Sequence, residues 1–140
     1  MTTRKANTQW KGSLMQGAGQ VTLSSSGLGT YDVSWPARTE EPNGKTSPEE
    51  LIAAAHSSCF SMALSLALDK AGHPPTSLDT TAKVTFQPGT GITGSALSVV
   101  GTVPGITAEQ FEEYAQDAKA NCPVSQALKI PITLETSFTG

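Results

Sequence analysis

The fold is decided by one stretch of sequence, Ser47-Pro-Glu-Glu-Leu-Ile-Ala-Ala-Ala-His-Ser-Ser-Cys-Phe-Ser-Met-Ala-Leu-Ser-Leu-Ala-Leu68. Its start carries helix signals: Ser47 can cap a helix, Pro48 suits the first helical position, and Glu50 completes a Ser-x-x-Glu capping box. Beyond the stretch, Gly72 can adopt the left-handed conformation that ends many helices. The pattern predicts one long helix at the centre of the chain.

This helix has no polar face. Leu51 to Leu68 is apolar or small on every side, with only His56 and four serines as polar interruptions. A bilayer span needs about 20 strongly apolar residues, and this stretch is too weakly hydrophobic, so we expect no membrane association. A helix that is apolar all round is buried. One small sheet can cover only one side of it, so the sequence predicts a homodimer that covers the other.

Size and charge exclude several classes of protein. With 140 residues, the chain is long enough for one domain, expected over residues 1–140. A net charge of −3 with nine basic residues gives no cationic surface for nucleic acid. The N-terminus is polar and has no apolar secretion signal, which indicates a cytoplasmic protein.

Short strands flank the central helix on both sides. Alternation and turn residues predict an α+β protein with the order β-β-β-α-β-β-α-β. Pro131 removes a hydrogen-bond donor from the last strand, which favours a place at a sheet edge or strand start. The predicted segments are strands at 8–13, 20–25 and 30–35, a loop over 36–46, a hairpin of 78–86 with 93–103, a helix opened by the capping box Thr107–Gln110, a short helical turn at 123–128, and a strand over 130–138.

The sequence gives no support for a metal or an organic cofactor. Potential metal ligands lack the spacing of zinc sites, so we expect His56 to be a hydrogen-bonded core histidine. The Gly-x-Ser-x-Gly motif of serine hydrolases is also absent.

The two cysteines remain as candidates for chemistry. Cys122 precedes Pro123 at an expected helix start, where backbone N–H groups lower the pKa of a thiol. Cys59 lies inside an apolar helix, where desolvation raises the pKa unless a cation is near. The residues alone thus favour Cys122 as the more reactive thiol. The simpler interpretation is that both are inert core thiols, because cysteine is often buried.

Arginine is scarce, and one of the two stands close to the central helix. Arg38 lies in the preceding segment, within reach of the carboxylates in the first turn of that helix. The alternative is an ordinary surface arginine paired with Glu40 or Glu41.

Two motifs together resemble the OsmC/Ohr family of thiol peroxidases, in particular its OsmC branch. They are the central stretch from Ser47 to Ser65 and Asn121-Cys-Pro-Val-Ser-Gln-Ala-Leu128. The resemblance extends over essentially the whole chain. It implies an OsmC-like fold, with antiparallel sheets wrapped around a buried central helix in an intertwined homodimer. It also implies a role in defence against oxidative and osmotic stress.

The resemblance assigns roles to four residues. It implies that Cys59 attacks the peroxide and that Cys122 resolves the product, which reverses the ranking from local pKa arguments. A nearby guanidinium can offset desolvation by favouring the thiolate. The Ohr branch supplies that arginine from its first hairpin, but residues 13–26 contain none. The OsmC branch points instead to Arg38, with Glu49 as the carboxylate that holds it.

The implied reaction needs only thiols. The Cys59 thiolate would cleave the O–O bond of an organic hydroperoxide and become a sulfenic acid. Cys122 would condense with it to a disulfide, and an external dithiol would reduce that disulfide. Lipoyl groups serve as this reductant in the Ohr branch. The alternative function is a non-catalytic dimeric domain that buries inert thiols and binds an apolar ligand.

The spacing of Glu49 and Cys59 adds one expectation. Ten residues along a helix correspond to about 15 Å, so Glu49 cannot reach the Cys59 of its own helix. Antiparallel packing of two such helices about a two-fold axis would bring the start of one beside the middle of the other. We therefore expect a shared site, with Cys59 and Cys122 from one subunit, Glu49 from its partner and Arg38 between them.

Overall fold

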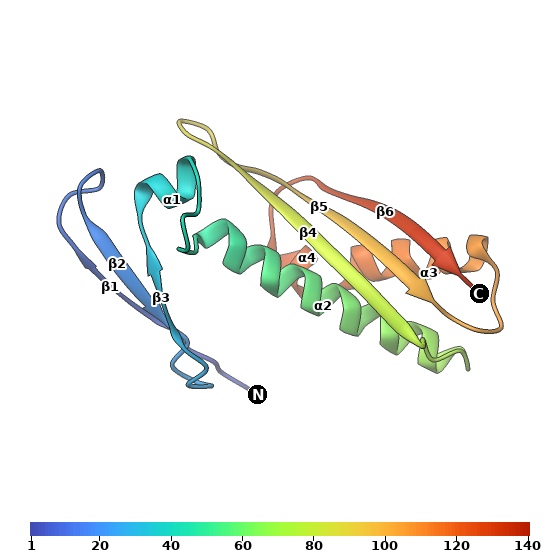
Figure 1. Ribbon diagram of the computed structural model, residues 1–140. Coiled ribbons are helices and arrows are strands. Elements are labelled where there is room, and N and C mark those ends of the chain that lie inside the picture. Colours follow the sequence, from blue (N-terminus) through green and yellow to red (C-terminus); the bar gives the residue numbers. More distant parts are fainter.

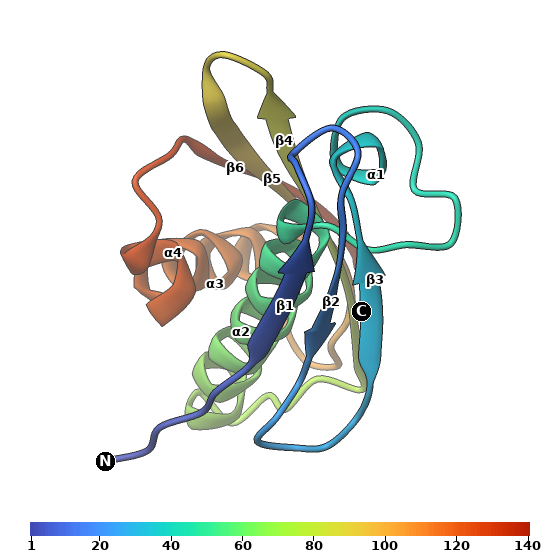
Figure 2. The same ribbon diagram turned by 90° about the vertical axis from the view of Figure 1, so that its left-hand side faces the viewer.

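The computed structural model describes residues 1–140 as two separate three-stranded sheets with helices (Figure 1). The N-terminal sheet consists of β1 (Asn7–Lys11), β2 (Ala18–Thr22) and β3 (Thr30–Val33), paired antiparallel in that order. It stands beyond the N-terminal end of the central helix (Figures 1 and 2). These three strands correspond to the three predicted ones, but β1 and β2 begin one and two residues earlier, and all three end two or three residues earlier.

A short helix, α1 (Trp35–Thr39), occupies part of the segment expected to be a loop. The hydroxyl of Ser34 accepts a hydrogen bond from the Ala37 N–H at 3.2 Å, and Pro36 lies in the first turn. These are ordinary helix-start signals. The prediction was wrong here because a single capped turn has no apolar periodicity. The consequence is that Arg38 is carried by a helix.

The central helix, α2 (Pro48–Lys70), begins and ends close to the predicted positions. Ser47 caps it by accepting from the Glu50 N–H at 3.1 Å. The predicted capping box is only half formed, because the Glu50 carboxylate accepts instead from the Thr46 hydroxyl at 2.6 Å. At the other end Gly72 has a φ of 86°, and its N–H and that of His73 donate to carbonyls of the last turn, as predicted for a left-handed cap.

The C-terminal sheet has the order β4-β5-β6. β4 (Ser77–Gln87) and β5 (Gly91–Thr102) form the predicted antiparallel hairpin. β6 (Ile132–Thr139) runs parallel to β5, which corrects the expectation of antiparallel pairing throughout. A parallel neighbour needs a long crossover, and α3 (Ala108–Asn121) with α4 (Pro123–Ala127) supplies it. Pro131 precedes β6 at the sheet edge, as predicted.

The core lies between this sheet and two helices. α2 packs on β4 and α3, and α3 packs on β6, so both helices cover one face of the sheet (Figure 1). α2 contributes four fully buried side chains at every fourth position, which form a single stripe along the helix. These residues are His56, Phe60, Leu64 and Leu68.

The other side of α2 is open. Met62 and Leu66 point away from the core and are 72% and 55% exposed. Within one chain α2 is therefore not buried on all sides, because the sheet and α3 cover only one stripe. By length and composition alone α2 also qualifies as a membrane span, a test that core helices of soluble proteins pass as well.

Candidate active site

The fold brings the two cysteines together. Cys59 lies in the middle of α2, and Cys122 ends α3 and caps α4. The Cys122 N–H donates to the Ala118 carbonyl at 2.8 Å, while its own carbonyl accepts from the Gln126 N–H at 3.0 Å. Both thiols are free, and they are close enough for each to affect the pKa of the other. Cys122 is fully buried, whereas Cys59 is partly exposed.

The two thiols ionise differently. Burial raises the pKa of Cys59, and the hydrogen bond with Cys122 and the charge of that residue raise it further, against a smaller effect of the Val124 N–H. Burial also raises the pKa of Cys122, but hydrogen bonds from Cys59, from the backbone and hydroxyl of Ser125 and from the Val124 backbone lower it overall. Cys122 is thus the more acidic thiol within one chain, in line with the ranking from the residues alone.

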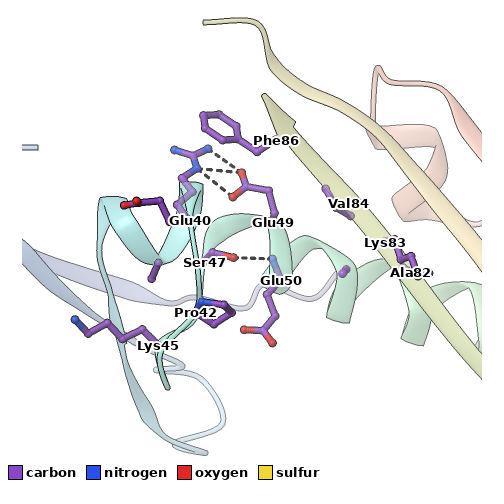
Figure 3. A pocket seen from close by; sticks show the side chains of 13 residues that line it. Glu40, Pro42, Lys45, Ser47, Glu49, Glu50, Ala82, Lys83, Val84 and Phe86 are labelled. Atoms are coloured by element: carbon purple, nitrogen blue, oxygen red, sulfur yellow. Dashed lines mark hydrogen bonds and ion pairs between the residues drawn. The ribbon is translucent and has the colours of Figure 1, made fainter. Parts of the chain in front are cut away.

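A second pair of candidate residues also meets. The Arg38 Nε lies 3.1 Å from each Glu49 carboxylate oxygen, and its Nη2 lies 2.8 Å from Oε2. Glu49 is in the first turn of α2 and is only 6% exposed. Figure 3 shows the ion pair beside Phe86. Arg38 therefore pairs with Glu49 and not with Glu40 or Glu41.

Contacts on both sides hold the guanidinium of Arg38 in place. Its Cζ lies 4.1 Å from the centroid of the Phe86 ring, and that ring packs edge-on against Trp35. The bidentate carboxylate and the aromatic face together fix its orientation. Nη1 makes no hydrogen bond within the chain, so one end of the fork stays available for another group. The pair borders a cavity of about 440 Å³ (Figure 3).

The two pairs do not meet within one chain. Cys59 borders a different cavity, of about 600 Å³, whose walls are mostly apolar. Its lining includes Met62, Ala63 and Leu66 from α2 and Pro123 from α4. No cation of the chain contributes to the pKa shift of Cys59. One chain thus holds a pair of thiols and, at the start of the same helix, a guanidinium held by a carboxylate.

His56 is a hydrogen-bonded core histidine, as expected. It is fully buried; its Nδ1 lies 2.7 Å from the Ser95 hydroxyl and its Nε2 lies 2.7 Å from the Ser125 hydroxyl. Burial lowers the pKa of the imidazole. No three potential ligands gather into a metal site. Sequence reasoning missed Ser95 and Ser125; the only available signal was that Ser125 lies in the first turn after Cys122.

Comparisons with known proteins agree on one relationship. The model of a family described as OsmC-like protein matches residues 41–137. "Peroxiredoxin OsmC" of Escherichia coli (strain K12) is 47% identical over 135 residues, which is 94% of each chain.

Solved structures share the fold. An organic hydroperoxide resistance protein OsmC from Legionella pneumophila superposes with a TM-score of 0.70 at 20% identity, covering 100% of both chains. An OsmC-like protein from Vibrio cholerae gives a TM-score of 0.73 at 20% identity, covering 97% of this chain and 99% of the other.

Proposed function

Because this chain belongs to the OsmC-like protein family and is a cysteine-based, peroxide-related stress protein, we propose that it reduces organic hydroperoxides at the expense of a dithiol. The observation that carries the proposal is the pair of free, neighbouring thiols, one in the middle of α2 and the other at the start of α4. Two adjacent thiols can supply the two electrons that the reduction of one peroxide needs, because they can be oxidised to a disulfide.

The proposed cycle has three steps. The Cys59 thiolate attacks the terminal oxygen of the hydroperoxide, the O–O bond breaks, and the sulfur becomes a sulfenic acid, while the departing alkoxide takes up a proton and leaves as an alcohol. The Cys122 thiolate then attacks that sulfur, and water and a disulfide form. An external dithiol restores both thiols by exchange. A lipoyl group has the chemistry of this reductant. The cycle needs no metal and no organic cofactor.

Access supports Cys59 as the residue that meets the peroxide. Cys122 has the lower pKa but is fully buried, so a substrate has no path to its sulfur. Cys59 is partly exposed and borders the apolar cavity of about 600 Å³. Apolar walls of this size favour an organic hydroperoxide over the small, polar hydrogen peroxide. We therefore assign the attack on the peroxide to Cys59, the more exposed thiol. Because the pKa of Cys59 is raised within one chain, another group has to favour its thiolate.

A homodimer would supply that group. The open face of α2, with Met62 and Leu66, is apolar and unpartnered in the single chain. Antiparallel packing of two α2 helices would place the Arg38–Glu49 pair of one chain beside Cys59 of the other. In this shared site Glu49 holds the guanidinium and Arg38 lowers the pKa of Cys59. We propose further that residues 1–140 form one domain that works in the cytoplasm and binds neither nucleic acid nor membranes.

Thiol counting tests the proposal. Reduced protein is mixed with one equivalent of cumene hydroperoxide per chain, and the free thiols are titrated. The expected result is the loss of two thiols per chain, with a Cys59–Cys122 disulfide found by mass spectrometry. Retention of both thiols would favour the alternative, a non-catalytic dimeric domain that binds an apolar ligand.

A further inference from the structure

His56 is completely buried, and none of the three steps above uses it. Its ring joins three elements, because Ser95 belongs to β5 and Ser125 to α4. Both serines are buried as well. Ser125 lies in the first turn of α4, three residues after Cys122, which caps that helix, and its hydroxyl helps to lower the pKa of the Cys122 thiol. A chain of hydrogen bonds thus runs from Ser95 through His56 to Ser125, whose hydroxyl is a neighbour of the Cys122 thiol.

The hydrogens of these hydrogen bonds can be arranged in only two ways. Burial keeps the imidazole of His56 neutral, so one ring nitrogen donates and the other accepts. If Nε2 carries the hydrogen, it donates to Ser125, whose own hydrogen is then free for Cys122. Ser95 then donates to Nδ1. If Nε2 is bare, Ser125 must donate to it and has nothing left to give to a thiolate.

We propose that His56 is a positioning residue for the resolving step: by donating from Nε2 to Ser125, it keeps the Ser125 hydroxyl hydrogen directed at the Cys122 sulfur and so stabilises the attacking thiolate. The proposal rests on the peroxidase function proposed above. It concerns the second step of the cycle and leaves the attack of Cys59 on the peroxide unaffected.

The resolving step balances without any further reactant. The Cys122 thiolate attacks the sulfur of the Cys59 sulfenic acid, the S–S bond forms and the S–O bond breaks. The departing hydroxide takes up the proton that the Cys122 thiol released on ionising, and water leaves. The Cys122 sulfur is oxidised and the Cys59 sulfur is reduced. Cys122 loses its negative charge, so the hydrogen bond from Ser125 favours the thiolate and not the product.

Two substitutions at the same position separate positioning from packing. The amide nitrogen of a glutamine occupies about the place of Nε2, whereas that of an asparagine occupies about the place of Nδ1. His56→Gln therefore keeps a donor for Ser125, and His56→Asn keeps only the contact with Ser95. Ser125→Ala removes the hydroxyl itself while changing little volume. The control is Ser61→Ala, which breaks another hydroxyl bond from α2 to the sheet, to Thr80 at 2.7 Å.

Each variant is mixed rapidly with one equivalent of cumene hydroperoxide. Formation of the Cys59 sulfenic acid is followed by trapping with dimedone, and formation of the disulfide by mass spectrometry of quenched samples. Raising the pKa of a thiol by one unit lowers its thiolate fraction about tenfold. The thiolate that remains is about threefold more nucleophilic, so the net rate falls about threefold. Disulfide formation should therefore slow about threefold or more in His56→Asn and Ser125→Ala, with sulfenic acid formation unchanged.

His56→Gln should resolve faster than His56→Asn, and Ser61→Ala should match the unaltered protein in both steps. Equal slowing by Gln and Asn would overturn the proposal, and so would resolution at the full rate in Ser125→Ala. If thermal melting shows that the His56 variants do not fold, Ser125→Ala decides alone. An unaltered protein that forms neither sulfenic acid nor disulfide would overturn the proposed function, and this proposal with it.

Discussion

At the scale of single residues, access and ionisation select different cysteines. Cys122 is the more acidic thiol but is enclosed, and Cys59 is accessible but has a raised pKa. The proposed division of labour follows from this difference, because the peroxide must reach the attacking sulfur whereas the resolving sulfur only has to reach its neighbour. Only Cys59 then needs a cation from outside its own chain to favour its thiolate.

Replacing each cysteine by serine should give different defects. Cys59→Ser should abolish peroxide consumption, because serine supplies no thiolate. Cys122→Ser should consume one equivalent per chain and then stop as a sulfenic acid, which mass spectrometry after dimedone trapping would detect. A Cys122→Ser protein that fails in the first turnover, with Cys59→Ser retaining it, would show that the more acidic thiol attacks.

Replacing the arginine should act through the ionisation of Cys59. In the proposed shared site Arg38 is the cation that favours the thiolate, so in Arg38→Ala the pKa of Cys59 should rise and the pH profile of the first step should move to higher pH. Each unit of that rise lowers the thiolate fraction about tenfold at pH values below the pKa. Thiolate absorbance measured against pH in a Cys122→Ser background checks this. An unchanged titration curve would remove Arg38 from the site.

Sequence reasoning could reach some of these residues and not others. The directions of the two pKa shifts match the ranking from local rules, but the largest effect that lowers the pKa of Cys122 is its contact with Cys59, which local rules did not supply. The pairing of Cys59 with Cys122 came from resemblance and not from local rules. The hydrogen bonds of His56 could not be predicted, because they join residues 39 and 69 positions apart in sequence.

At the scale of elements, local signals defined the ends of α2 and α3. The Thr107–Gln110 capping box is complete, as predicted, whereas that of α2 is half formed because Thr46 competes for Glu50. The five-residue α1 was missed, since it spans little more than one turn and is too short to show an apolar periodicity. The parallel direction of β6 was also missed, because strand pairing depends on the path of the crossover and not on the strand itself.

The C-terminal cap of α2 gives a prediction for stability. Gly72 has a φ of 86° and open space where a Cβ would lie, so an added methyl group would meet only the cost of backbone strain. Gly72→Ala should lower the free energy of unfolding by about 1–2 kcal/mol. Urea denaturation followed by circular dichroism measures the change. The matched control is Ala71→Gly. Ala71 lies one residue earlier and has right-handed helical geometry, so this substitution neither adds nor removes left-handed backbone strain.

At the scale of the whole molecule, the arrangement of α2 is the central feature. The chain covers one stripe of this helix and leaves the Met62–Leu66 side open. The N-terminal sheet stands apart from the C-terminal one, with the start of α2 between them (Figure 1). The sequence predicted the need for a second covering surface from the lack of a polar face alone. Which chain covers it is a proposal, because composition does not specify a partner.

Subunit complementation tests the shared site most directly. Cys59→Ser chains and Glu49→Ala chains are mixed under conditions that exchange subunits, and peroxide consumption is compared with that of each parent. In a mixed dimer with shared sites, one site receives both lesions and the other combines an intact Cys59 with an intact Glu49. We expect the mixed dimers to show activity that neither parent shows. If exchange is demonstrated by labelled chains and no activity returns, each chain uses its own residues and the shared site is wrong.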